Sequence, residues 1–258
     1  MSAFRGSWLV WHWKRIWPWC NPLRWYWYGH MHFTEWCKFW RNYDQYIQMC
    51  GDNDPLPRLD CMLPCLGDDK GFTPVEPIYF YQNAWAFGHI VQDRPAEHID
   101  VGSHHGFVSL LSRVVPVTMV DIRPLNVTLD SLAFKAGSIL SLPFADESIA
   151  SLSSLCVVEH IGLGRYGDSI DPCGTEKAIA ELLRVLAPDG LLYISLPLDN
   201  VNRVYFNAHR AFDEKYLLSL FSPLEIMDSK YVFGSRFSSE RLEGFGVGCY
   251  KLRKSRQF

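Results

Sequence analysis

The segment from His98 to Asp121 constrains the fold of this 258-residue chain more than any other part. A short apolar strand ends in the glycine turn of His98-Ile-Asp100-Val-Gly102-Ser-His104-His105-Gly106, and after a helix-like run a second strand ends in Val120-Asp121. Glycines let the backbone approach a ligand closely, and an acid after the second strand can accept hydrogen bonds from ribose hydroxyls. The segment therefore predicts an open α/β sheet that binds a nucleoside.

Strands alternate with helices from residue 97 onward. The alternation predicts a parallel sheet with right-handed crossovers, and the apolar runs suit strands that are buried on both faces. Two strands at the C-terminal end, with no helix between them, are expected to form an antiparallel hairpin at the sheet edge. The predicted strands are 97–102, 116–121, 134–137, 150–157, 190–197, 224–233 and 244–252, and the predicted helices are 78–92, 106–114, 124–132, 175–187 and 213–221.

The N-terminal part differs from this pattern in composition. Nine of the ten Trp lie within residues 1–40, and residues 1–41 carry six basic groups and one acid. Apolar spacings of three and four predict a helix over 34–50, and the five prolines of residues 51–77 indicate a connector. We therefore divide the chain into an aromatic-rich, basic extension with its connector, residues 1–77, and a second domain, residues 78–258.

Two interpretations of the extension stay open. Trp and Tyr rings at the lipid headgroups, with Lys and Arg on anionic lipid, would make residues 1–41 a peripheral membrane contact. Alternatively, the rings would pack on the second domain or on another copy of the chain, giving a homo-oligomer. A net charge of −3 argues against nucleic-acid binding by the whole chain. No run reaches the roughly 18 uninterrupted apolar residues of a membrane span.

Cysteine and histidine usage indicates a cytoplasmic protein without a metal site. Eight Cys in a chain of this size, with no export signal in view, are typical of reduced thiols. Cys61-x-x-x-Cys65 lacks a matching second pair, and the doublets His104-His105 and His30-x-His32 lack neighbouring acids or thiols. We therefore expect no metal ion.

Three segments of the second domain resemble the class I methyltransferases that use S-adenosylmethionine. They are residues 100–106, the run Leu142-Pro-Phe-Ala-Asp-Glu-Ser148 continuing into 155–161, and residues 181–190. More narrowly, residues 158–168, Asp171-Pro172 and 206–210 resemble the methyltransferase-like domain-of-unknown-function 268 family. The resemblance implies a Rossmann-like class I methyltransferase fold, with a mostly parallel seven-stranded sheet, an antiparallel C-terminal edge hairpin and an aromatic-rich N-terminal helical extension.

The same resemblance implies S-adenosylmethionine as the cofactor and assigns its contacts. The glycine turn would border the methionine part, the acid after the second strand would hold the ribose, and residues 156–160 would form the floor between cofactor and substrate. The implied cofactor-binding residues are Asp100, Gly102, Gly106, Asp121, Ser138, Ile139 and Cys156.

Two residues depart from the family pattern. His104 replaces the middle glycine of the first motif, and Ser138 stands where many members carry an acid beside the adenine. An imidazole in the turn is expected to crowd the ligand, or to force φ into a region that histidine tolerates less well than glycine.

Candidate reaction groups follow the fourth and fifth strands, at the sheet edge where α/β proteins bind ligands. His160 and His209 are candidate bases, because imidazole titrates near neutral pH. The alternative is that these residues only fix their loops by hydrogen bonds or pack against the core. The candidate substrate-binding residues are Arg165, Tyr166, Asp168, Asn207 and Arg210.

The function predicted from the sequence is S-adenosylmethionine-dependent O-methylation of a sugar or lipid-linked glycan intermediate, at the cytoplasmic face of a membrane. The glycan is implied only by the family resemblance. The alternative is a catalytically inactive binding or scaffold protein in a glycan-assembly pathway. His104 is the residue that separates the two hypotheses.

Overall fold

The computed structural model describes residues 22–51, 55–222 and 224–256, and the chain forms two compact units, Met1–Pro74 and Val75–Phe258. Most of the Trp-rich head, residues 1–21, lies outside the described residues.

The first unit contains a long helix, α2 (Pro22–Met49), and a short 3-10 helix, η1 (Leu59–Cys61). Helix α2 begins earlier than the predicted 34–50, at a proline. Proline is favourable in the first turn because the N–H groups of that turn have no acceptor within the helix, so a residue without an N–H loses no hydrogen bond. Trp36 lies 6.5 Å from Trp40 in a stacked arrangement, and Trp40 meets Tyr43 edge-on at 5.7 Å. Tyr43 Oη donates to Pro57 O at 3.4 Å and so ties the connector to the helix. Among the described helices, none combines the length and apolarity that crossing a bilayer requires.

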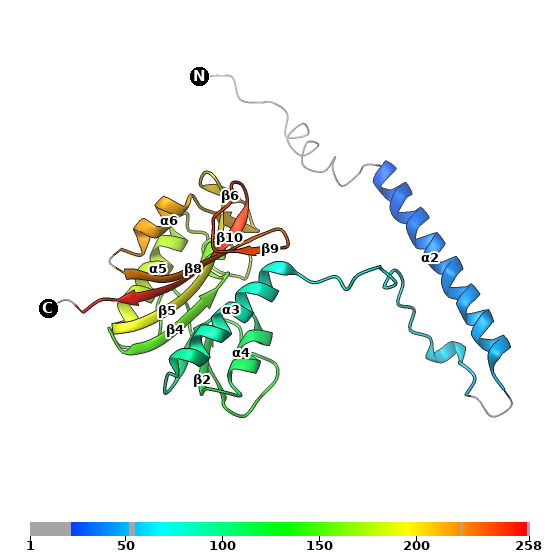
Figure 1. Cartoon of the computed structure of the whole chain (residues 1–258), viewed down its shortest axis with the longest axis horizontal. Helices are drawn as coiled ribbons and strands as arrows, with labels where there is room; N and C mark the ends of the chain where they lie inside the picture. The colour runs from blue at the N-terminus through cyan, green and yellow to red at the C-terminus, as the bar shows by residue number, and fades with distance from the viewer. Residues whose placement is uncertain (1–21, 52–54, 223, 257–258) are drawn as a thin grey trace, which may run out of the picture. The chain divides into compact units, whose positions relative to one another are not determined.

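The second unit is built on an eight-stranded sheet with the order β3-β2-β1-β4-β5-β10-β8-β9 (Figure 1). The strands from β3 to β5 are parallel to one another, whereas β10 runs antiparallel to both β5 and β8. The predicted Rossmann-like fold with an antiparallel edge is confirmed. The sheet has eight strands rather than seven because a turn at Gly234, with φ +56°, folds β9 back onto β8. The strands are β1 (His98–Val101), β2 (Val117–Asp121), β3 (Leu132–Ala136), β4 (Ile149–Leu155), β5 (Leu186–Leu198), β8 (Leu224–Phe233), β9 (Arg236–Ser238) and β10 (Gly246–Lys254).

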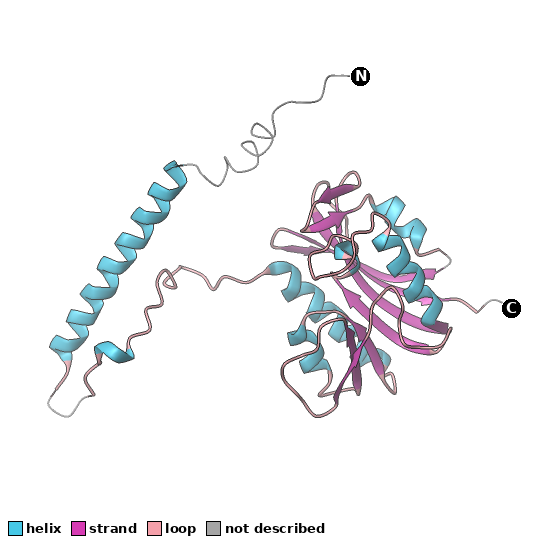
Figure 2. Ribbon diagram, turned by 180° about the vertical axis from the view of Figure 1, so that it is seen from behind, coloured by secondary structure: helices cyan, strands magenta, loops and turns pink. Residues whose placement is uncertain are grey.

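Helices cover both faces of this sheet. One face packs against α3 (Pro77–Asp93) and α4 (His105–Leu111), and the other against α5 (Gly174–Val185) and α6 (Glu214–Leu220). Figure 2 shows the same layers from behind, with helices on both sides of the strands. Burial on both faces explains why the central strands are nearly continuous apolar runs.

Two connections differ from the sequence-based prediction. The helix predicted over 124–132 is absent: the apolar side chains Val127 and Leu129 are exposed, so this segment has no buried apolar face to stabilise a helix. A left-handed residue, Ser131 with φ +69°, leads the chain directly into β3. The loop after β5 contains an unpredicted antiparallel pair, β6 (Arg203–Tyr205) and β7 (His209–Ala211).

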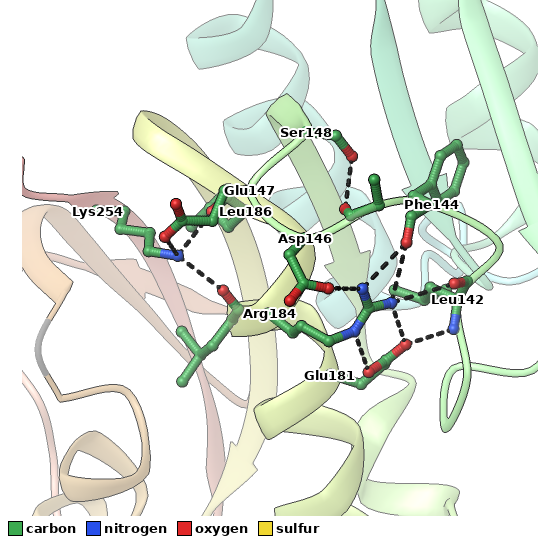
Figure 3. Close-up of polar contacts among 11 residues, drawn as sticks. Leu142, Phe144, Asp146, Glu147, Ser148, Glu181, Arg184, Leu186 and Lys254 are labelled. Carbon is green, nitrogen blue, oxygen red and sulfur yellow. Dashed lines mark hydrogen bonds and ion pairs between the residues drawn. The ribbon is translucent and has the colours of Figure 1, made fainter.

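Arg184 on α5 joins two of the three segments that carry the family resemblance (Figure 3). Its guanidinium donates to Asp146 Oδ1 at 2.5 Å and to Phe144 O at 3.1 Å. It also binds both carboxylate oxygens of Glu181, whose Oε1 accepts the Leu142 N–H at 2.6 Å. These contacts therefore fix the run 142–148, which lies between β3 and β4, against α5.

Leu152, at the centre of β4, is fully buried between the helical layers. We expect Leu152→Ala to lower the free energy of unfolding by about 3 kcal/mol, because a cavity remains where the side chain was. Leu110→Ala is the control, since Leu110 is 68% exposed on α4, and a change of about 0.5 kcal/mol or less is expected there. Urea unfolding measures both variants, and equal effects would contradict this description of the core.

Candidate active site

The glycine turn after β1 lies directly against the turn after β4. Gly102 has φ +72°, and a Cβ at this position would stand 2.9 Å from Val157 Cγ1, so both conformation and space require glycine. Ser103 Oγ accepts the Leu155 N–H at 3.0 Å, and Ser154 Oγ donates to Val101 O at 3.1 Å. The two strand ends are therefore fixed against each other at the carboxyl edge of the sheet.

Asp100 holds this turn from inside the protein. Its carboxylate accepts the Ser103 N–H at 3.0 Å and the Ser153 hydroxyl at 2.5 Å, and the residue is fully buried. Burial raises the pKa of Asp100 to about 6, against the opposing effect of these donors. Beside it, the buried His98 ring lies 2.8 Å from the hydroxyls of both Ser151 and Ser153, and burial lowers the pKa of His98 to about 3. Both carboxylate oxygens of Asp100 are therefore engaged by protein donors, and Asp100 can affect a ligand at this edge only by shaping the turn.

His104 does not strain the turn. Its backbone has φ −60° and ψ 130°, and its ring Nδ1 accepts the Gly106 N–H at 3.1 Å as the cap of α4. The expected unfavourable φ is therefore wrong, because position 104 takes an extended cap conformation. The ring lies 4.1 Å from that of His105 and 5.1 Å from that of Tyr79. A Cβ at Gly106 would stand 3.1 Å from His104 Nδ1, so a larger residue there would require the His104 ring to shift.

Asp121 ends β2 at the same edge, as predicted. Its Oδ1 accepts the Arg123 N–H at 2.8 Å, and the carboxylate side chain is 12% exposed. The two positions expected beside an adenine separate: Ser138 Oγ accepts the Leu140 N–H at 3.2 Å, whereas Ile139 is 6% exposed and packs in the core. Ile139 therefore belongs to the hydrophobic core beside this turn.

The loop after β4 is held by its own polar groups. Asp168 accepts backbone N–H groups from Gly162, Gly164 and Tyr166, at 2.7, 3.3 and 3.2 Å. Burial alone would raise the pKa of Asp168, but these N–H donors lower it below its ordinary value. The geometry favours the alternative in which Asp168 orders the loop.

Arg210 also has a structural role. It is 7% exposed, and its guanidinium donates to the carbonyls of Ile161, Asp171 and Pro172 at 2.5, 3.0 and 3.4 Å. The expected clamp on a substrate is replaced by a clamp on the loop, because these carbonyls occupy the planar donors. Asn207, with φ +64°, reaches the same loop through Leu163 O at 3.5 Å.

Tyr166 connects the β2 side of the site with the β4 side. The Arg123 guanidinium lies 4.3 Å from the centre of its ring, and that of Arg165 lies 5.0 Å away. The ring of His160 meets it edge-on at 5.6 Å. The structure thus brings Arg123, which follows β2, and His160, which follows β4, into contact with the same aromatic ring.

His160 is a neutral imidazole with a defined proton. Its Nδ1 lies 2.6 Å from Ala208 O, and because a carbonyl can only accept, Nδ1 carries the proton and Nε2 the lone pair. Burial lowers the pKa of His160 to about 4, although the Ala208 carbonyl opposes the shift. His209 is packed 4.9 Å from the Tyr205 ring and 5.6 Å from the Phe245 ring, and burial lowers its pKa as well.

Three polar residues meet beneath the first turns of α3, and sequence reasoning named only one of them as a ligand contact. Cys156, in a left-handed conformation with φ +52°, donates from Sγ to Gln82 Oε1 at 3.1 Å. Glu159 is 1% exposed, and burial raises its pKa to about 8. The available signal for Gln82 was an amide on the otherwise apolar face of the predicted helix 78–92. Within the described residues no group of three or more His, Cys, Asp or Glu is arranged to hold a metal ion.

Comparison with solved structures identifies the class of fold. A 1,6-didemethyltoxoflavin-N1-methyltransferase of Burkholderia thailandensis, with bound 1,6-didemethyltoxoflavin and S-adenosylhomocysteine, superposes with a TM-score of 0.52, 19% identity and coverage of 68% of this chain and 77% of that chain. The N-methyltransferase NodS of Bradyrhizobium japonicum WM9, in complex with S-adenosylhomocysteine, gives a TM-score of 0.52, 15% identity and coverage of 70% and 89%. The second unit has the fold of the class I S-adenosylmethionine-dependent methyltransferases.

The family is recognised over part of the second unit. Residues 138–244 match the family described as "Caenorhabditis protein of unknown function, DUF268", which confirms the predicted family resemblance over that segment. A search of curated proteins gave no match.

The raised pKa of Glu159 predicts a pH dependence of stability. The folded protein keeps the Glu159 proton up to about pH 8, whereas the unfolded chain loses it near its ordinary pKa of 4.5. The contribution of this proton is fully present below pH 4.5 and is lost as the pH rises through 8. We expect the free energy of unfolding of the wild type, relative to Glu159→Gln, to fall by on the order of 4 kcal/mol across this window.

Glu176→Gln is the matched control for this measurement, because Glu176 on α5 is a partly buried acid whose carboxylate accepts from Tyr216 Oη at 2.6 Å and not from the groups around Glu159. Urea unfolding at pH 5, 7 and 9 gives the free energies. Parallel curves for the wild type and Glu159→Gln would exclude a buried, protonated Glu159.

Proposed function

We propose that this protein is an S-adenosylmethionine-dependent methyltransferase. The observation that carries the proposal is the close approach of the β1 and β4 turns beside Asp121, within a class I methyltransferase fold. A sheet of this kind binds its ligand outside the carboxyl ends of the strands. The structural neighbours with bound S-adenosylhomocysteine support the same cofactor class for this chain.

The residues at the edge fit this cofactor. Gly102 gives a backbone turn without a side chain, and Asp121 places a largely shielded carboxylate, 12% exposed, after β2 for the ribose hydroxyls. Ser138 lies in the turn after β3, on the side expected for the adenine. When bound, S-adenosylmethionine supplies a methyl group on a positively charged sulfur. Acidic side chains in the neighbouring turns would stabilise that charge.

The proposed acceptor is a hydroxyl of a sugar, with a lipid-linked glycan as the particular form. Exposed aromatic rings pack on His209: Tyr205 is 41% and Phe245 46% exposed, and both contact its ring. Such surfaces suit a sugar, whose apolar faces stack on rings while its hydroxyls need hydrogen bonds. Arg165 and Tyr166 line the neighbouring loop, where they would orient the sugar. His160 lies at the same edge, with its Nδ1–H donating to Ala208 O.

The extension is proposed to keep the protein at the cytoplasmic membrane face. Phe33, Trp36 and Trp40 on α2 are 66%, 39% and 43% exposed. Exposed rings of this kind, next to the basic groups of residues 1–41, suit the headgroup region of an anionic membrane. A lipid-linked acceptor would then be presented close to the second unit by its own anchor.

The cofactor assignment predicts that S-adenosylhomocysteine binds the purified chain in calorimetry. Asp121→Asn should weaken this binding at least about tenfold, because it removes the charge from the ribose hydrogen bonds while keeping the size of the side chain. Asp130→Asn, on the exposed crossover after β2, is the control and should leave the affinity unchanged. No heat with the wild type at millimolar ligand would contradict the proposed function.

The membrane assignment is tested by sedimentation with vesicles that contain phosphatidylglycerol. The double variant Trp36→Ala and Trp40→Ala should lose more than half of the bound fraction, and a chain without residues 1–41 should lose nearly all. Leu63→Ala, an exposed apolar side chain of the connector, serves as the control. Equal binding of all four proteins would exclude the membrane role.

A further inference from the structure

A buried amide and a buried carboxyl flank the Cys156 thiol beneath α3. Gln82 is fully buried, and its Oε1 accepts from Cys156 Sγ at 3.1 Å and from Ser195 Oγ at 2.8 Å. Its Nε2, which carries two N–H donors, has no partner among the described residues. The Glu159 carboxyl interacts with the same thiol from the other side.

Glu159 is also incompletely paired. Its Oε1 lies 3.7 Å from His160 Nε2, and its Oε2 is buried without a hydrogen-bond partner among the described residues. Buried polar groups are nearly always hydrogen-bonded, because an unmade bond loses the hydration of the group without replacement. Two residues that contact the same thiol and each carry an unpaired buried polar atom, next to the β4 turn, therefore indicate a place where a polar ligand group completes the hydrogen bonding.

The two groups are complementary in type. Gln82 Nε2 can only donate, whereas a carboxylate oxygen of Glu159 can accept. A hydroxyl accepts one hydrogen bond and donates one, so a single hydroxyl satisfies both. An ammonium group could not accept from the amide, and a carboxylate or phosphate could not donate to an ionised Glu159.

We propose that Gln82 and Glu159 bind the hydroxyl of the methyl acceptor, and that Glu159 Oε2 takes its proton. This inference rests on the proposed methyltransferase function and names a catalytic residue and an acceptor contact within it. The acceptor oxygen forms the new O–C bond with a lone pair, and the electron pair of the broken C–S bond stays with the sulfur. The O–H bond breaks as its proton passes to Glu159, which the positive charge of the bound donor has first ionised with release of its own proton to solvent, so the sulfonium methyl donor is the only co-reactant.

The surroundings of Glu159 favour this role over His160. Cys156, Tyr79, His160 and Arg165 are the titratable or charged groups that act on Glu159 or are acted on by it. Burial makes Glu159 a stronger base than an ordinary carboxylate and makes His160 a weaker base than an ordinary imidazole. The proton of the acceptor hydroxyl therefore passes to Glu159 rather than to His160. His160, held by Ala208 O, positions the carboxyl.

The test compares the protons released when S-adenosylmethionine and S-adenosylhomocysteine bind. If Glu159 stands beside the reacting methyl, the positive charge of the donor drives its ionisation, whereas the uncharged product does not. At pH 7, calorimetry in phosphate and in Tris should give roughly half a proton or more of additional release with S-adenosylmethionine. This readout requires no acceptor and no turnover.

Glu159→Gln should abolish the difference while both ligands still bind, and Glu176→Gln should retain it. Equal proton release by the wild type with the two ligands would overturn the assignment, and so would a difference that persists in Glu159→Gln. The comparison of proton release with the two ligands needs only the wild type, so the test stands even if the Glu159→Gln variant folds poorly. Failure of both ligands to bind the wild type would instead overturn the proposed methyltransferase function.

Discussion

The contact between the turns after β1 and β4 is the constraint on which the rest of the site depends. Gly102 leaves β1 with positive φ, and Val157 fills the space that a side chain would take. Ser103 and Ser154 then join the two strand ends by hydrogen bonds. Because these bonds are buried, the edge cannot open without leaving polar groups unpaired. Every candidate group at the edge is positioned relative to this contact.

A second layer of polar contacts builds the substrate side on that frame. Arg210 binds three carbonyls of the loop after β4, and Asp168 binds three of its N–H groups. These residues make the loop rigid, and they leave Arg165, Tyr166 and His160 as the groups directed toward the edge. Charged residues in one short stretch therefore have different roles: Arg210 and Asp168 bind backbone groups of the loop, whereas Arg165 and His160 share the Ala208 carbonyl and pack on Tyr166.

The fold could be predicted in large part, and the site only in part. Apolar runs and glycine turns are local signals, so β1, β2 and β4 were located within two residues of their observed bounds, whereas β5 begins four residues before the predicted 190. The residues 124–132 were misassigned because helix propensity says nothing about whether a face will be buried. The role of Arg210 and the burial of Ile139 could not be read from the chain, since both depend on neighbours that lie far away in the sequence.

The alternation of strands and helices, the glycine at position 102 and the acid at position 121 are readable along the chain, because each follows from backbone sterics or from periodicity over a few residues. That His104 caps a helix without strain, and that Gln82 and Glu159 meet at Cys156 with unpaired polar atoms, emerges only in the folded molecule. Those outcomes depend on burial and on which hydrogen-bond partners arrive from other elements. Burial sets the protonation of Glu159 and His160, and no local pattern of residues contains that information.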